Sequence, residues 1–256
     1  MLKVRVIPTL LWKDVGLVKG IRFASDRRVG PMVPAVRVYA GRDVDELILV
    51  DVAASDRGAG PDLQLCAEAA DEAPVPLTFG GGITSVAHVG ALLAAGADKV
   101  SINTCAVESP SLITEAANLF GSQCIVVSID ALTGTEGRYG VVTRSGSSAT
   151  QLQAEEWARE CEERGAGEIL LTAVHRDGTR EGYDLQLIRS VADSVTIPLI
   201  ASGGAGSYEH MREAVRAGAD AVAAASIFHY TELTPAGAKD HLARADIPVR
   251  KSRNEM

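Results

Sequence analysis

The sequence predicts an α/β protein, a single (β/α)8 TIM barrel over residues 1–256. Short apolar runs alternate with segments of helical periodicity along the chain, and the second half repeats the pattern of the first as an internal half-barrel repeat. Strands that alternate with helices form a parallel sheet. At 256 residues, closure of that sheet into one barrel domain is the economical arrangement.

Eight apolar runs are expected to form the barrel, in the order Val4–Leu11, Glu46–Asp51, Val75–Gly80, Lys99–Ile102, Cys124–Asp130, Glu168–Thr172, Pro198–Ala201 and Ala221–Ala225. Helices are expected between them, for example over Ser85–Ala95, Ser111–Phe120, Leu152–Arg164, Leu185–Asp193 and Tyr208–Ala217. Gly96 and Gly218 follow two of these helices, where a residue able to take positive φ commonly ends a helix. Gly137–Val142 is expected to lie in an extra hairpin after the fifth strand.

The internal repeat is carried by an ordered set of identical residues. When Gly81-Gly82 is aligned with Gly203-Gly204, the same register pairs Pro76 with Pro198, Ser85 with Ser207, His88 with His210, and Ala95-Gly96-Ala97-Asp98 with Ala217-Gly218-Ala219-Asp220. Such a run is typical of a duplicated supersecondary unit. Two unrelated units that share a common barrel pattern are the alternative.

Composition excludes several classes of partner. The net charge is −8 and no basic run is interleaved with aromatic residues, so nucleic acid is not expected to bind. Four separated cysteines form no CxxC pair, which indicates reduced thiols and no metal site. No export signal or membrane-length apolar run is present. We therefore expect a cytoplasmic protein without a metal or cofactor.

Two glycine-rich turns, residues 79–83 and 201–206, each follow a strand and precede a helix. Glycine lets backbone N–H groups approach a bound anion, and a helix N-terminus favours negative charge. The eighth strand contributes Ala225-Ser226 beside the second turn. Two such turns on opposite sides of a barrel rim predict a ligand phosphorylated at both ends. Glycines needed only for tight turns are the alternative.

Polar residues at the carboxyl ends of the strands are candidates for catalysis and ligand binding. They are Asp51, Asn103, Asp130 and Thr172, with Asp177 on the loop beyond. Because Asp130 ends an apolar strand, its carboxylate is expected to be desolvated and able to carry a proton near neutral pH. A structural role as a cap is the alternative for Asp130. The matching residue of the first strand is Leu11, which cannot move a proton.

Four charged residues stand at the opposite, amino ends of the strands: Arg5, Glu46, Lys99 and Glu168. If these side chains point inward, they form a ring across the floor of the barrel. Four ions are costly to desolvate, so such a ring suggests a function, for example a gate for a small neutral molecule. The alternative is that these side chains point outward, into solvent or into ion pairs at the surface.

The chain resembles the cyclase subunit of imidazole glycerol phosphate synthase along nearly its whole length. The residues that carry the resemblance are Val6-Ile7-Pro8, Val18-Lys19-Gly20, Asp45-Glu46-Leu47, Gly80-Gly81-Gly82-Ile83, residues 96–104, Gly121-Ser122-Gln123, residues 165–172, Arg176-Asp177-Gly178-Thr179, Gly182-Tyr183-Asp184 and residues 200–206.

The resemblance implies a heterodimer with a glutaminase subunit docked under the barrel, near Asp98 and Gln123. Ammonia would pass through the ring of Arg5, Glu46, Lys99 and Glu168, which serves as the gate, to an acceptor at the rim. Asp130 would be catalytic. The implied ligand-binding residues are Lys19, Asp51, Gly81, Gly82, Asn103, Thr104, Thr172, Asp177, Ser202, Gly203, Gly204, Ala225 and Ser226.

The departures from that family point to a paralogous branch. Leu11 stands where the family has a second catalytic aspartate, the loop at residues 27–31 is basic rather than acidic, and Val174-His175 replaces an Ile-Asp pair. Loss of one proton-transfer group costs a factor of about 10² to 10⁴ in rate. The resemblance is to the branch associated with amidino sugars of lipopolysaccharide, in which a sugar amidotransferase accepts the ammonia.

Three functions are therefore kept open. The first is an ammonia-conducting, cyclase-like subunit of a glutamine amidotransferase system. The second is the histidine-pathway cyclase, a lyase that forms imidazole glycerol phosphate from a bis-phosphorylated ribulosyl formimino carboxamide. The third is a scaffold that binds a phosphorylated metabolite without chemistry.

Overall fold

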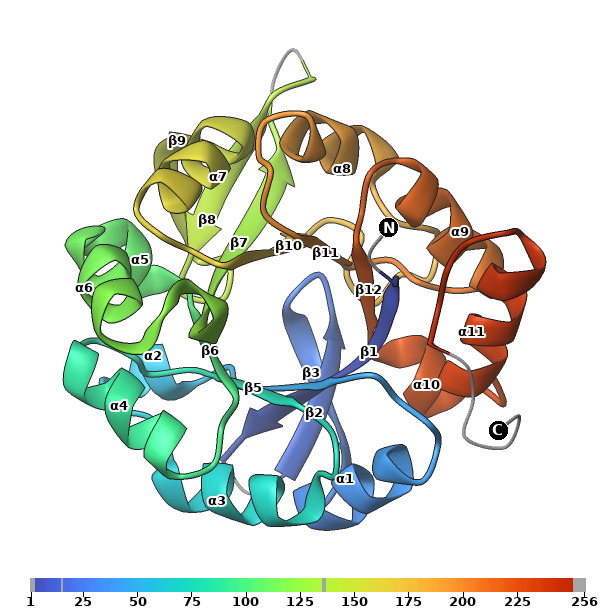
Figure 1. Ribbon diagram of the computed structural model, residues 1–256, viewed down its shortest axis with the longest axis horizontal. Coiled ribbons are helices and arrows are strands. Elements are labelled where there is room, and N and C mark those ends of the chain that lie inside the picture. Colours follow the sequence, from blue (N-terminus) through green and yellow to red (C-terminus); the bar gives the residue numbers. More distant parts are fainter. Residues whose placement is uncertain (1–2, 15, 135–136, 251–256) are drawn as a thin grey trace.

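The computed structural model describes residues 3–14, 16–134 and 137–250. Each of eight parallel strands pairs with two neighbours, so the sheet closes into a barrel (Figure 1). Around the barrel the strands are β1 (Arg5–Lys13), β4 (Leu47–Asp51), β5 (Leu77–Gly80), β6 (Lys99–Ile102), β7 (Ile125–Thr133), β10 (Glu168–Ala173), β11 (Leu199–Ser202) and β12 (Ala221–Ala224). The predicted fold is confirmed.

An outer ring of helices covers the barrel (Figure 1). The longer helices are α1 (Met32–Ala40), α3 (Leu63–Glu72), α4 (Val86–Ala94), α6 (Ser111–Phe120), α7 (Ala154–Glu163), α8 (Leu185–Ala192), α9 (Tyr208–Arg216) and α11 (Pro235–Arg244). Short helical turns are α2 (Ala54–Arg57), α5 (Thr104–Glu108), η1 (Ser122–Cys124) and α10 (Ser226–Tyr230). None of the helices in the described part of the chain is long and apolar enough to cross a membrane.

Two antiparallel hairpins extend the sheet. The hairpin expected after the fifth strand is present as β8 (Tyr139–Thr143) and β9 (Ser148–Gln153). Leu152 and Gln153 belong to β9, so α7 begins two residues later than predicted. The second hairpin, β2 (Gly16–Ile21) with β3 (Ala24–Gly30), was not predicted, and the segment interpreted as a loop at residues 27–30 lies in β3.

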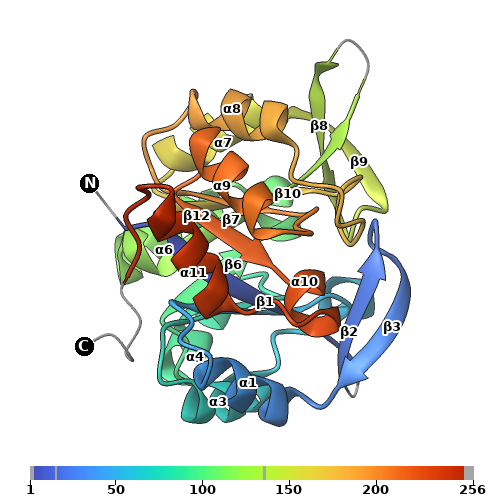
Figure 2. The same ribbon diagram turned by 90° about the vertical axis from the view of Figure 1, so that its right-hand side faces the viewer.

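The β2–β3 hairpin lies at one end of the barrel and both chain termini lie at the other (Figure 2). The turn of this hairpin uses Arg22 (φ 53°) and Phe23 (φ 61°), which are in the left-handed region without being glycine. Arg22 N–H donates to the carbonyl of Asp177 at 2.8 Å. The hairpin therefore folds from β1 across the carboxyl ends of the strands to the loop after β10.

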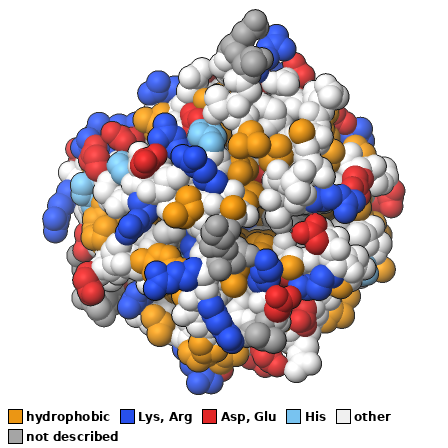
Figure 3. Space-filling model, turned by 180° about the vertical axis from the view of Figure 1, so that it is seen from behind, with side chains coloured by type: hydrophobic (Ala, Val, Ile, Leu, Met, Phe, Trp, Pro, Cys, Tyr) orange, Lys and Arg blue, Asp and Glu red, His pale blue; other side chains and the backbone are white. Residues whose placement is uncertain are grey.

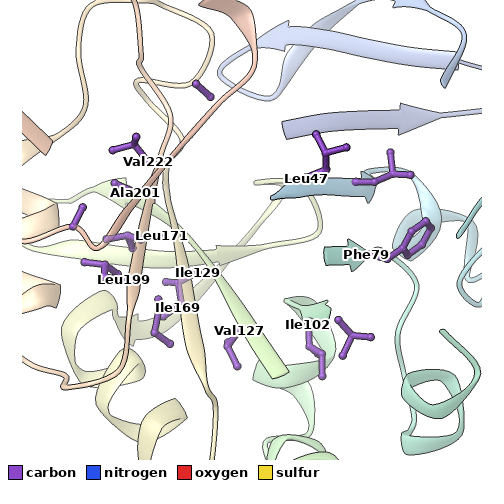
Figure 4. Close-up of a cluster of buried hydrophobic side chains, with 14 of the residues drawn as sticks. Leu47, Phe79, Ile102, Val127, Ile129, Ile169, Leu171, Leu199, Ala201 and Val222 are labelled. Carbon is purple, nitrogen blue, oxygen red and sulfur yellow. The ribbon is translucent and has the colours of Figure 1, made fainter. Parts of the chain in front are cut away.

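Two separate hydrophobic layers stabilise the barrel. Outward-facing strand residues such as Phe79, Ile129 and Leu199 pack in the larger cluster, against the helices (Figure 4). The smaller cluster fills the barrel interior and contains Ile7, Ile48, Val126, Leu170, Ile200, Ala221 and Ala223. Cys66 and Cys161 are buried and Cys105 and Cys124 are half-buried, all four as free thiols.

The repeat predicted from the sequence has equivalent contacts in its two halves. Ser85 Oγ accepts from His88 N–H at 3.3 Å, and Ser207 Oγ accepts from His210 N–H at 3.2 Å. Asp98 Oδ2 accepts from Leu77 N–H at 2.8 Å, as Asp220 Oδ2 does from Leu199 N–H at 3.0 Å. Each serine caps a helix and each aspartate fixes the start of a strand, so the identical residues have the same structural role in both halves.

Candidate active site

A cavity of about 700 Å³ opens at the carboxyl ends of the barrel strands, which we call the rim. Figure 3 shows this side of the molecule, where Lys and Arg side chains lie around a hollow near the centre. Every residue predicted to be catalytic or ligand-binding lines the cavity: Lys19, Asp51, Gly81, Gly82, Asn103, Thr104, Asp130, Thr172, Asp177, Ser202, Gly203, Gly204, Ala225 and Ser226. The fold therefore brings these residues together from both halves of the repeat.

Asp130, at the carboxyl end of β7, is the titratable group best suited to proton transfer. Its Oδ2 accepts a hydrogen bond from Asn103 Nδ2 at 2.7 Å. Burial raises the pKa of Asp130 to about 7, the charge of Asp177 adds to the increase, and hydrogen bonds from Asn103 and Thr172 oppose it. A carboxyl group with a pKa near 7 can both give and take a proton at neutral pH.

The raised pKa of Asp130 predicts a pH-dependent stability cost. In the unfolded chain this group ionises near pH 4, whereas in the folded protein it ionises near pH 7. The folded state therefore loses relative stability as the pH rises through this range. We expect Asp130→Asn to raise the free energy of unfolding by roughly 2–4 kcal/mol at pH 8, and to change it little at pH 4. Urea unfolding at the two pH values measures this. A variant no more stable than the parent protein at pH 8 would contradict the assignment.

Leu11, at the position where the resemblance implies a second catalytic acid, lines the cavity. It lies on β1 opposite Val50 of β4 in the strand register. Both side chains are apolar. Residue 11 therefore contributes no carboxyl group to the rim, where Asp51 and Asp177 line the cavity together with Asp130.

Lys19 and Asp177 form a buried ion pair on the cavity wall. Their Nζ and Oδ2 atoms are 2.5 Å apart, and 3% of the Lys19 side chain is exposed. Lys19 belongs to β2, so the unpredicted hairpin is what carries this cation to the loop after β10. Asp177 N–H donates to the carbonyl of Ala173, and a Cβ on Gly203 would lie 2.7 Å from the same oxygen, so the ion pair lies on the side of the second glycine-rich turn.

The glycines of the two turns are required by close backbone contacts. A Cβ on Gly81 would lie 2.4 Å from the carbonyl oxygen of Asp51, and one on Gly204 would lie 2.1 Å from that of Gly182. Both also have positive φ. The tight-turn explanation is therefore sufficient for these glycines. Their position on the cavity wall is compatible with the phosphate prediction but does not test it.

The four charged residues at the floor of the barrel point inward and form a closed ring. Glu46 is 2.7 Å from Arg5 and 3.0 Å from Lys99, and Glu168 is 3.1 Å and 3.0 Å from the same two cations. Thr78 Oγ1 also donates to Glu46, at 2.7 Å. Burial lowers the pKa of Arg5, but the charges of Glu168 and Glu46 outweigh it and leave the pKa raised. The alternative of outward-pointing side chains is wrong.

Apolar side chains fill part of the barrel interior between the ring and the cavity. The cavity reaches down to the hydroxyl-bearing residues Thr9, Ser101 and Ser128 and includes none of the four ring residues. Ile7 and Ile48, each two residues beyond a ring residue, are buried and do not line the cavity. Ser101 and Leu170, each also two residues beyond a ring residue, do line it. Apolar side chains therefore separate the cavity from the ring on β1 and β4, whereas on β6 and β10 the cavity extends to the residues next above the ring.

The two predicted docking residues lie at the floor, away from the cavity. Asp98 precedes β6 and is exposed. Gln123 lies in η1, which precedes the neighbouring strand β7, and its Nε2 donates to the carbonyl of Phe120 at 3.3 Å. The two side chains are accessible on adjacent parts of one surface.

Several cavity residues were not identified from the sequence. Arg57, Arg144 and His88 line the wall, whereas His175, which replaces a family aspartate, does not. His175 Nε2 is instead 3.0 Å from Asp184 Oδ2. Arg57 stands in the loop after the second strand, where barrel enzymes commonly carry site residues, and this position was the available signal.

Comparison with known families agrees with this architecture. The family model described as "Histidine biosynthesis protein" matches residues 5–234, which span all eight barrel strands, the floor ring and all the predicted cavity residues. The match covers most of the chain. The chain therefore belongs to the histidine biosynthesis protein family, whose members are (β/α)8-barrel enzymes.

Proposed function

We propose that this protein is a cyclase-like subunit of a glutamine amidotransferase system, which receives ammonia from a glutaminase at the barrel floor and binds a phosphorylated ligand at the rim. The observation that carries the proposal is the closed ring of Arg5, Glu46, Lys99 and Glu168 beneath the cavity. A structural core does not require four ions there, since packed apolar side chains are commonly at least as stable.

The charged ring at the floor is followed by apolar side chains inside the barrel, and this order suits the passage of a neutral molecule. Ammonia can cross an apolar layer such as that of Ile7 and Ile48, whereas ammonium would have to leave its hydration shell. The ring would open when a partner binds at the floor, and small displacements of the apolar side chains would allow passage. At the bottom of the cavity, the hydroxyl groups of Thr9, Ser101 and Ser128 offer hydrogen bonds to the incoming ammonia.

The acceptor is inferred from the rim. With Leu11 in place of an acid, ring closure by paired acid and base is impaired, so the ammonia would serve another acceptor. The paralogous branch linked to amidino sugars of lipopolysaccharide, with a sugar amidotransferase as final acceptor, is the assignment that fits this change. Function in the cytoplasm follows from the same assignment.

The second candidate is the histidine-pathway cyclase, and a specific observation favours it. All predicted ligand-binding residues line one cavity, together with Asp130. The scaffold without chemistry is less favoured, because the raised pKa of Asp130 and the floor ring have no role in it.

An assay with the bis-phosphorylated cyclase substrate and ammonium salt separates the first two candidates. We expect formation of imidazole glycerol phosphate at least about 100-fold slower than with a cyclase that has both acids. Turnover at a rate comparable to that of a cyclase with both acids would identify the protein as a working cyclase. Glutamine-dependent amination that survives Lys99→Ala would instead remove the floor ring from the mechanism.

Docking of the glutaminase can be tested with a matched pair of variants. Asp98 and Asp220 make the same hydrogen bond to a strand N–H, so Asp98→Lys and Asp220→Lys should perturb the fold equally. With a glutaminase subunit of the imidazole glycerol phosphate synthase type, we expect Asp98→Lys to weaken binding about tenfold or more in titration calorimetry. Asp220→Lys should change the free energy of glutaminase binding by less than half as much as Asp98→Lys does. Equal losses would place the docking site elsewhere.

A further inference from the structure

The backbone holds Arg57 beside the first glycine-rich turn. Arg57 ends α2, which stops at Gly58 with φ 60°. The next residues pack on the turn, since a Cβ on Gly82 would lie 2.7 Å from the carbonyl oxygen of Ala59. Gly81 in turn lies against Asp51. The guanidinium is thus built onto the same end of the cavity as Gly81 and Gly82.

Asp51 was predicted to bind the ligand, but its carboxylate is almost completely covered. Its Oδ2 accepts from Arg57 Nη2 at 2.6 Å and its Oδ1 from Ala53 N–H at 3.0 Å. The exposed fractions of the side chains are 2% for Asp51 and 40% for Arg57. A ligand that enters this end of the cavity therefore meets the guanidinium, which Asp51 orients.

Arg57 keeps donors for a ligand. Its other contact in this region, Nη1 to Asp14 Oδ1, is 3.4 Å long and involves an aspartate that is 67% exposed. A guanidinium has five N–H donors in a planar fork, so these two contacts leave several unused. A fork of this kind matches two oxygens of a phosphate group at once.

The cation that is paired with a buried aspartate of the cavity wall differs between the two ends of the cavity. At the second glycine-rich turn the cation is Lys19, held by Asp177. The repeat position of Arg57 is Thr179, which does not line the cavity. The duplicated fold therefore does not dictate an arginine at residue 57. A point charge at one end and a planar fork at the other would distinguish the orientations of an asymmetric ligand.

We propose that Arg57 determines ligand specificity by binding one phosphate monoester group of the ligand with two N–H donors, at the cavity end formed by Gly81, Gly82, Asn103 and Thr104. Asp51 acts as its positioning residue. The inference rests on the proposed function, because that function supplies the phosphorylated ligand.

The test measures binding of the bis-phosphorylated cyclase substrate without ammonia, by calorimetry. We expect Arg57→Gln to raise Kd about 30- to 100-fold, and Arg57→Lys about tenfold because the charge remains without the fork. Arg37→Gln is the matched control, since Arg37 also pairs with a carboxylate but lies on the outer surface formed by the helices. The Kd of this variant for the substrate should not change. Circular dichroism and thermal unfolding confirm that each variant is folded.

The possible results distinguish a failure of the role of Arg57 from a failure of the proposed function. If the parent protein binds the ligand and folded Arg57→Gln binds equally well, the role of Arg57 is overturned and the phosphorylated ligand stands. If Arg57→Lys binds as tightly as the parent protein, binding of the phosphate group by two N–H donors of Arg57 is overturned. If the parent protein does not bind at all, the phosphorylated ligand of the proposed function falls, and this inference falls with it.

Discussion

Replacing Glu46 with alanine is expected to lower the free energy of unfolding by about 3–5 kcal/mol. Glu46 is 2% exposed and contacts Arg5, Lys99 and Thr78. Without it, two cations share only Glu168, and the ring carries an uncompensated charge in a poorly solvated place. Urea or thermal unfolding measures the loss. The surface pair of Arg37 and Glu72 is the control, and Glu72→Ala should lower the free energy of unfolding far less than Glu46→Ala does.

The cause of that loss can be checked with a second substitution. If the penalty comes from unbalanced charge, Lys99→Met in the Glu46→Ala background removes the excess cation. The double variant should then be less destabilised than the sum of the two single variants, with a coupling energy of about 1–3 kcal/mol. Additive effects would show that Glu46 contributes mainly through packing and through its hydrogen bond with Thr78.

The ring variants also address function. With a glutaminase bound at the floor, a folded Glu46 variant should transfer less ammonia from glutamine, while ammonium added directly at the rim should still react. A parallel loss of both activities would indicate general damage to the barrel and not a defect at the gate. The stability measurement and this comparison together separate the structural cost of the ring from its proposed purpose.

The parts of the fold set by local pattern were predictable from the sequence. The bounds of β6 and α6 are as expected, since an apolar strand and an amphipathic helix are defined by their own residues. The β2–β3 hairpin was missed because Arg22 and Phe23 form its turn in the left-handed region, where glycine or asparagine would have signalled it. In addition, residues 27–31 were interpreted as a basic loop, although residues 27–30 belong to β3.

The sequence predicted which residues line the same cavity, but it did not predict which of them form hydrogen bonds or ion pairs with one another. Position at the carboxyl end of a strand was enough to bring Asp51, Asn103 and Asp130 to one cavity. The partner of Asp51 is Arg57, six residues away on a one-turn helix, and strand periodicity contains no information on that contact. Likewise, the sequence suggested that Arg5 and Glu46 could point into the barrel, but it did not identify Ile7 and Ile48 as apolar side chains of the interior.

Leu11→Asp is expected to raise ammonium-dependent ring closure about 10- to 100-fold above the parent protein, because general acid–base catalysis contributes about 10² to 10⁴ in rate and one new group recovers part of it. The other residues that the resemblance to the cyclase implies for its site are present. Asp130 has a pKa near 7, and the predicted binding residues line the same cavity as Leu11. Formation of imidazole glycerol phosphate from the bis-phosphorylated substrate and ammonium salt is the measurement.

Two further variants show whether the gain comes from proton transfer. Leu11→Asn has a similar shape and polarity to Leu11→Asp but no proton to exchange in this pH range, so it should give no increase. Adding Asp130→Asn to Leu11→Asp should abolish the gain, since the two carboxyl groups would act as a pair across the cavity. A folded Leu11→Asp protein that binds the substrate yet stays inactive would mean that the rim is remodelled for another acceptor, and not a cyclase site that lacks one acid.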